Sequence, residues 1–126
     1  DLETTKCFES LPNLEKLDLT YCEISAIKNL DKLTKLKMLD LSGNEQLNDI
    51  EGLENLHSLE YLNLYATEVS DISVLNKLPN LVEANLDYRH INEKDIPKLL
   101  DNPEVAIFLF EPYSPFSIWE SGLFKV

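Results

Sequence analysis

Residues 33–44 read LTKLKMLDLSGN, with leucine at positions 33, 36, 39 and 41. The last two of these leucines are two residues apart, so both side chains point to one face of a short strand. The same order of apolar residues, LxxLxxLxL, begins at Leu11, Leu33, Leu56 and Leu78, with Ala84 in place of one leucine in the last copy. These starting points are 22, 23 and 22 residues apart, and self-similarity at such a period is the signature of a repeat protein.

The half of each repeat that follows the LxL step has apolar residues at every third position. In the first three repeats they are Ile24, Ile27 and Leu30, then Leu47, Ile50 and Leu53, then Val69, Ile72 and Leu75. A step of three suits a tight 3₁₀-like or extended arc, and stacked coils can bury residues that one coil alone cannot. The sequence therefore predicts an α/β repeat solenoid with a parallel sheet and one strand per coil. The strands are expected to centre on Leu17–Leu19, Leu39–Leu41, Leu62–Leu64 and Ala84–Leu86.

Two segments carry a family resemblance. Residues 33–44, and the segment VSDISVLNKLPNL at residues 69–81, resemble the leucine-rich repeats of the bacterial internalins. They are also similar to the short-repeat class that includes a regulatory subunit of type 1 protein phosphatase. The resemblance covers residues 2–91. It implies a leucine-rich-repeat arc with a 3₁₀ or extended convex side, whose concave parallel sheet grips a protein partner.

The same resemblance implies an asparagine ladder, in which a polar side chain three residues after the LxL step bonds backbone groups between coils. The corresponding positions here are Cys22, Asn44, Thr67 and Arg89. Cysteine, asparagine and threonine are small enough to turn inward and donate to backbone carbonyls. Arg89 departs from the pattern, which suggests that the ladder ends at the fourth coil.

The expected organisation has three parts. Residues 1–10 form part of a preceding repeat, residues 11–91 form four leucine-rich repeats, and residues 92–126 form a C-terminal part with a different period. Because the chain begins inside a repeat, we expect another segment or a partner to cover that end, or a polar cap to have been removed.

The C-terminal part is expected to hold one short helix on the convex side and a fifth strand. Asp95 is a candidate N-cap, Pro97 lies within the first turn, and Pro103 stops the helix. Residues 105–111, VAIFLFE, predict the strand. The aromatic tail from Pro112 onward either caps the last coil or acts as a binding segment.

Strand side chains that alternate with the buried leucines are expected to point to the concave surface. In register they form three columns: Lys16, Met38, Tyr61, Glu83 and Ile107; Asp18, Asp40, Asn63, Asn85 and Leu109; and Thr20, Ser42, Tyr65, Asp87 and Glu111. Tyrosine suits a binding hot spot because it buries a large area and keeps a polar tip. The candidate partner-binding residues are Asp18, Asp40, Tyr61, Asn63, Tyr65, Glu83, Asn85 and Asp87.

The net charge indicates the kind of partner. The chain carries 23 acidic and 11 basic residues, for a formal net charge of −12. This charge repels phosphate backbones, which argues against nucleic acid, and it attracts basic protein surfaces. The acidity could equally serve only to keep a repeat protein soluble.

The sequence therefore predicts a non-catalytic protein-binding module with a basic partner. Two alternatives stay open: a dedicated inhibitor or immunity protein that masks a basic toxin or enzyme, and a fragment of a bacterial surface adhesin. His57 and His90 are isolated, and no nucleophile, phosphate-binding or zinc motif is present. We therefore expect no enzymatic activity, no cofactor and no metal.

Cysteine usage and hydropathy bear on the location of the protein. Cys7 and Cys22 form no metal or redox motif, so reduced thiols in the cytoplasm are expected. No apolar stretch is long enough to span a membrane, which argues against insertion. Because the chain begins at Asp1 without a methionine, removal of a signal peptide would leave a secreted or surface location open.

Overall fold

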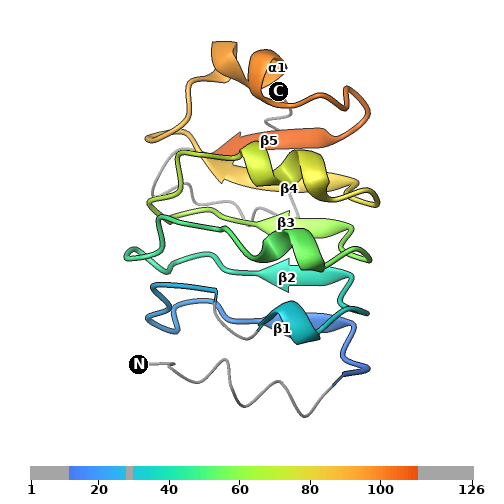
Figure 1. Ribbon diagram of the computed structural model, residues 1–126. Coiled ribbons are helices and arrows are strands. Elements are labelled where there is room, and N and C mark those ends of the chain that lie inside the picture. Colours follow the sequence, from blue (N-terminus) through green and yellow to red (C-terminus); the bar gives the residue numbers. More distant parts are fainter. Residues whose placement is uncertain (1–11, 28–29, 111–126) are drawn as a thin grey trace.

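A computed structural model describes residues 12–27 and 30–110. Within these residues the chain winds into stacked coils, and each coil contributes one short strand (Figure 1). The strands are β1 (Lys16–Asp18), β2 (Met38–Asp40), β3 (Tyr61–Asn63), β4 (Glu83–Asp87) and β5 (Ala106–Phe110). They form a parallel sheet in the order β1-β2-β3-β4-β5. The predicted repeat solenoid with a parallel sheet is confirmed.

The return path of each coil runs through a short 3₁₀ segment. These segments are η2 (Leu30–Lys32), η3 (Leu53–Asn55), η4 (Ser73–Lys77) and η5 (Glu93–Asp95), and the helix α1 (Ile96–Leu99) follows directly. Figure 1 shows η2, η3 and η4 stacked in front of the strands, and η3 contacts both of the others. The 3₁₀ convex side and the one short helix are confirmed. Asp95 is the N-cap residue of α1, although its side chain makes no capping hydrogen bond.

One continuous apolar core fills the space between the sheet and the 3₁₀ segments. In the second coil, Leu33, Leu36, Leu39 and Leu41 are all 0% exposed. Burial of one such side chain contributes about 1.5–3 kcal/mol. The cluster extends without interruption from Leu17 in β1 to Ile107 in β5. Because every coil buries its leucines against those of its neighbours, the coils stabilise one another.

Asn44 joins the second coil to the first. Its amide nitrogen Nδ2 donates to the carbonyl oxygens of Leu19, at 3.0 Å, and Leu41, at 2.7 Å. Its oxygen Oδ1 accepts from the backbone N–H groups of Cys22, at 3.0 Å, and Ile24, at 2.9 Å. The side chain therefore acts at the ladder position as the sequence predicted.

The other small ladder residues bond within their own coils. Thr67 Oγ1 donates to the carbonyl oxygen of Leu64 at 2.7 Å, and Cys22 Sγ donates to that of Thr20 at 3.4 Å. Cys22 is a free thiol packed against the core, whereas Cys7 lies outside the described residues. The inward donation to carbonyls is confirmed, but the bond between coils is made by Asn44.

The register of the first four strands agrees with the prediction, and that of β5 does not. Lys16, Met38, Tyr61 and Glu83 lie side by side, but Ala106 follows Glu83 where Ile107 was expected. Ile107 instead pairs with Ala84 and is 3% exposed, inside the core. The prediction was one residue off because β5 is apolar at every position, so alternation of polar and apolar residues cannot fix which face is buried.

This shift also replaces the last members of the other two columns. Phe108, not Leu109, lies beside Asn85, and Phe110, not Glu111, lies beside Asp87. The expected acidic end of the third column is therefore wrong. The aromatic tail from Pro112 lies outside the described residues, so both alternatives for it stay predictions.

Candidate protein-binding face

The side chains of the sheet that point away from the core form one surface, which we call the concave face. Its described side chains are Lys16, Met38, Tyr61, Glu83 and Ala106; Asp18, Asp40, Asn63, Asn85 and Phe108; and Thr20, Ser42, Tyr65 and Asp87. The first two of these columns follow the strand register, and the third column continues from the carboxyl ends of the strands. All eight candidate residues therefore belong to one surface, and their role in binding stays a prediction.

Accessibility divides the candidate residues into two groups. Asp18 is exposed, while Asp40, Tyr61, Tyr65 and Glu83 are half-buried. The remaining three side chains are almost inaccessible: Asn63 is 2% exposed, Asn85 0% and Asp87 1%. A partner that approaches this face meets the first group, and the second group supports the face from inside.

The first two aspartates of the face also end their strands. Asp18 Oδ1 accepts hydrogen bonds from the backbone N–H of Thr20, at 2.9 Å, and from its hydroxyl. Asp40 makes the same two contacts with Ser42, at 2.9 Å to the N–H and 2.6 Å to the hydroxyl. Each carboxylate accepts a hydrogen bond from a backbone N–H group that would bond to a neighbouring strand if its own strand were longer. Aspartate side chains typically compete in this way with backbone acceptors at turns. This explains why β1 and β2 end one residue before the second leucine of the LxL step.

These turns also hold negative charge in a defined place. The Thr20 hydroxyl, and next the Thr20 N–H group, lower the pKa of Asp18 from its usual value of 3.8. A carboxylate that accepts hydrogen bonds stays ionised, because protonation would remove an acceptor site. Asp18 is therefore a fixed anion at the exposed end of the concave face.

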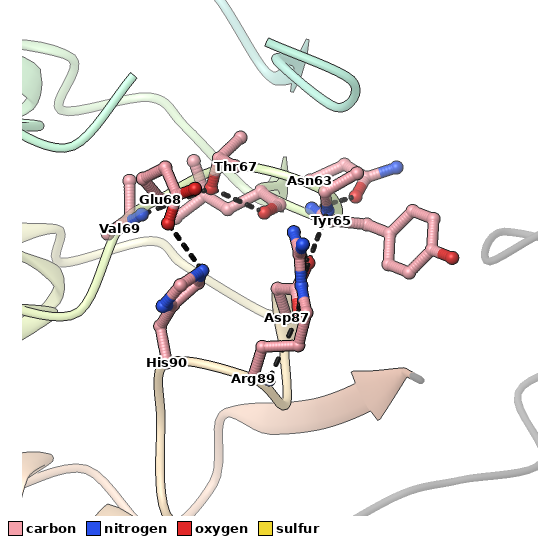
Figure 2. A network of polar contacts seen from close by, with 10 residues as sticks. Asn63, Tyr65, Thr67, Glu68, Val69, Asp87, Arg89 and His90 are labelled. Carbon is pink, nitrogen blue, oxygen red and sulfur yellow. Dashed lines mark hydrogen bonds and ion pairs between the residues drawn. The ribbon is translucent and has the colours of Figure 1, made fainter. Parts of the chain in front are cut away.

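Asp87 has a different environment, which Figure 2 shows at close range. Its Oδ2 accepts from the backbone N–H of Ala66 at 3.0 Å, and its Oδ1 accepts from the backbone N–H of Arg89 at 3.0 Å. The Arg89 guanidinium closes the site, with Nη2 at 2.8 Å from Oδ2 and Nε at 3.0 Å from Oδ1. The carboxylate is therefore occupied within the fold, and Arg89 at the ladder position is its counter-ion. The Asp-x-Arg spacing is a sequence signal for this role: it repeats the Asp-x-Thr and Asp-x-Ser spacing of earlier coils, two residues further along the repeat.

One aromatic residue of this face was not expected from the sequence. Phe108 lies in β5 and packs against Ala106 of the same strand and against Tyr65. Tyr65 follows β3, so its contact with Phe108 spans β4, which lies between β3 and β5. Next to Phe108, the buried amide of Asn85 has no hydrogen-bond partner at either Nδ2 or Oδ1. Phe108 thus extends the aromatic surface from Tyr65 toward β5. Phe108 was missed because the predicted register placed it among the core residues.

A second acidic surface lies on the convex side. Asp49, Glu51, Glu54 and Asp71, with Lys77, line a shallow hollow between η3 and η4. Across residues 12–27 and 30–110, no group of three His, Cys, Asp or Glu side chains is arranged to hold a metal ion. No helix in this described part is long and apolar enough to cross a bilayer. The convex hollow is a matched control surface for any test of the concave face.

Comparisons with known proteins agree with this architecture. A family model described as Leucine Rich repeats (2 copies) matches residues 12–55. The fold is similar to an internalin, inlF, from Listeria monocytogenes, with a TM-score of 0.63 and 33% identity, over 70% of this chain and 25% of that one. It is also similar to internalin C2 (inlC2) from Listeria monocytogenes, with a TM-score of 0.55 and 27% identity, over 86% of this chain and 57% of that one.

A curated relative is a much larger protein than this chain. A Roc-COR-CHAT protease from an unknown prokaryotic organism is 32% identical over 93 residues, which are 74% of this chain and 9% of the protease. The chain spans less than two thirds of the length of each of these three relatives.

Proposed function

Because this chain is a leucine-rich-repeat protein similar to the bacterial internalins, we propose that its concave face binds a protein with a basic surface. Stacked repeats of this kind present an extended concave surface, which these proteins use for binding. The observation that carries the proposal is the arrangement of Asp18, Asp40 and Glu83 around Tyr61 and Tyr65 on one surface.

Charge and aromatic area would contribute differently to the complex. The concave face has three accessible carboxylates and one cation, Lys16, among its described side chains, in a chain with a net charge of −12. Such a field attracts a basic surface and speeds encounter. Tyr61 and Tyr65 are half-buried, so a partner could complete their burial and gain the free energy typical of an aromatic hot spot. The three remaining candidate residues, Asn63, Asn85 and Asp87, would support this surface through packing and turn geometry.

The same binding function would also serve in a longer protein. The protease relative matches this chain over only 9% of its own length. We infer that the solenoid acts as a recognition segment, and catalysis is not part of the proposal. A dedicated inhibitor of a basic enzyme would use the same face in the same way.

Affinity capture from the source cells tests the proposal. The wild-type chain would be compared with a concave variant, Asp18→Asn with Tyr61→Ala, and a convex variant, Glu51→Gln with Glu54→Gln. We expect a basic protein to be retained by the wild type and the convex variant, and to be lost from the concave variant. Circular dichroism would confirm that all three chains fold.

The outcome separates the alternatives. If the captured protein is an enzyme whose activity falls on binding, the chain is an inhibitor. If it keeps its activity, the chain is a recognition module. Retention of every captured protein by the concave variant would contradict the proposal.

A further inference from the structure

The turns that follow the strands lie at the carboxyl-terminal rim of the sheet, apart from the concave face and the convex hollow. Equivalent positions in successive coils, one residue beyond the third column of the concave face, are occupied by Tyr21, Gly43, Ala66 and Tyr88. The backbone N–H of Tyr21 donates to the carbonyl oxygen of Ser42 at 3.0 Å, so the first two turns are held side by side. We call these four residues the turn column.

Tyr21 is held in an unusual way. Its φ is 52°, in the left-handed region where a residue without a β-carbon is preferred, and its side chain is 72% exposed. The ring lies over Gly43, so closely that a β-carbon at residue 43 would be 2.6 Å from ring atoms Cδ1 and Cε1. Strain of this kind clusters at functional sites because the fold alone would not select it. A large aromatic ring is thus presented to solvent at some cost to the fold.

A second set of equivalent positions carries carboxylates in the first three coils. Glu23, Glu45 and Glu68 each lie two residues after a turn-column residue, and all three are exposed. In the next coil His90 occupies this position, and its Nε2 lies 2.6 Å from Glu68 Oε2 (Figure 2). That contact shows that side chains at these positions meet across neighbouring coils.

Exposed aromatic rings and a carboxylate on one rim suit one cation in particular. Arginine stacks its planar guanidinium on a tyrosine ring and can donate two parallel hydrogen bonds to a carboxylate. Lysine can do neither with the same geometry. Tyr88, which is 48% exposed, lies at the far end of the turn column from Tyr21.

We propose that this rim, from Tyr21 to Tyr88 with Glu45 as its carboxylate, binds an extended arginine-bearing segment of a partner protein. The proposal goes beyond the concave-face function, because it uses a separate set of side chains. Tyr21 and Tyr88 are three coils apart, or roughly 14 Å at the usual spacing between strands. An extended chain advances about 3.3 Å per residue, so arginines four residues apart match the two rings.

Defined peptides test the site without knowledge of the natural partner. The probes are acetyl-Arg-Gly-Gly-Gly-Arg-amide, acetyl-Arg-Arg-Gly-Gly-Gly-amide and the lysine form of the first, titrated into ¹⁵N-labelled protein. The spaced arginine peptide should shift the amide signals of Tyr21, Gly43 and Glu45. It should bind about two- to five-fold more tightly than either other peptide, as expected for a stacked cation at an exposed site.

Tyr21→Gly separates binding from folding. Removal of the ring should weaken binding of the spaced arginine peptide about two- to five-fold. Because glycine adopts the left-handed turn without strain, the Tm should stay the same or rise. A purely structural tyrosine would give the opposite change in Tm. If Tyr21→Gly destabilises the fold, Glu45→Gln, which leaves the ring in place, should still weaken binding.

The controls keep this inference distinct from the concave-face proposal. Tyr61→Ala on the concave face and Glu51→Gln with Glu54→Gln on the convex side should leave peptide binding unchanged. Equal affinity for all three peptides, or signal shifts centred on the convex hollow, would mean unspecific attraction to an acidic protein and would overturn the rim site.

Discussion

The carboxylate of Asp87 accepts a hydrogen bond of 3.0 Å from the backbone N–H of Ala66, one coil earlier in the stack. Ala66 has a φ of 56°, a left-handed conformation that alanine rarely adopts. The bond from Asp87 therefore holds a strained turn in place and links the fourth coil to the third. Asn44 makes the equivalent link between the second coil and the first.

Asp87→Ala should destabilise the protein by about 2–4 kcal/mol, because the Ala66 N–H and the Arg89 guanidinium would both lose their acceptor. Denaturation in urea would measure the change. Asp49→Ala is the matched control, because its exposed carboxylate caps only the N–H of Glu51 and its loss should cost less than about 1 kcal/mol. Similar losses for the two variants would show that Asp87 does not link the coils.

Asn44→Ala should cost about 3 kcal/mol or more, since two N–H groups and two carbonyls lose their partner together. Hydrogen exchange gives a sharper test. The amides of Cys22 and Ile24, which donate to Asn44 Oδ1, should lose protection first. The amide of Leu64, which donates to the Asn85 carbonyl further along the stack, should change much less. A uniform loss of protection would contradict a local role.

Thr20→Val should raise the pKa of Asp18 toward its usual value of 3.8, because the hydroxyl is the largest cause of its lowering. At pH values above the unfolded-state pKa of Asp18, the lowered pKa of the folded state contributes to stability. This contribution is lost as the pH falls through the folded-state pKa. The part of the stability difference between wild type and variant that comes from Asp18 ionisation should therefore be present at neutral pH and vanish in acid. A ¹³C titration of the Asp18 carboxyl measures the pKa, with exposed Thr34→Val as the control.

Asp18→Asn with Asp40→Asn should slow association with a basic partner and weaken its salt dependence. Asparagine keeps the oxygen that accepts from Thr20 and Ser42, so the turns are preserved while two charges are removed. Tyr61→Ala should instead speed dissociation, with a cost of about 2 kcal/mol. Surface plasmon resonance at two salt concentrations separates the rates. Loss of binding with Glu51→Gln and Glu54→Gln, and none with the concave variants, would place the partner on the convex side.

The spacing of the leucines by itself determined the solenoid. A step of two can bury both leucines only from a strand, and a period near 22 residues stacks each strand on an equivalent one. The register of β1 to β4 followed, because polar and apolar residues alternate clearly in those strands. The inward position of Asn44 could also be predicted, since its place in the repeat matched the family ladder.

The tertiary structure alone decided which concave residues a partner can reach. Asp18 and Asp87 both looked like acidic face residues in the sequence, yet one is exposed and the other is buried against Ala66 and Arg89. In β5, apolar residues on both faces left the register open, and packing placed Ile107 in the core and Phe108 beside Asn85. Local patterns specify which elements form, but burial depends on contacts between coils that are distant in sequence, which no local pattern contains.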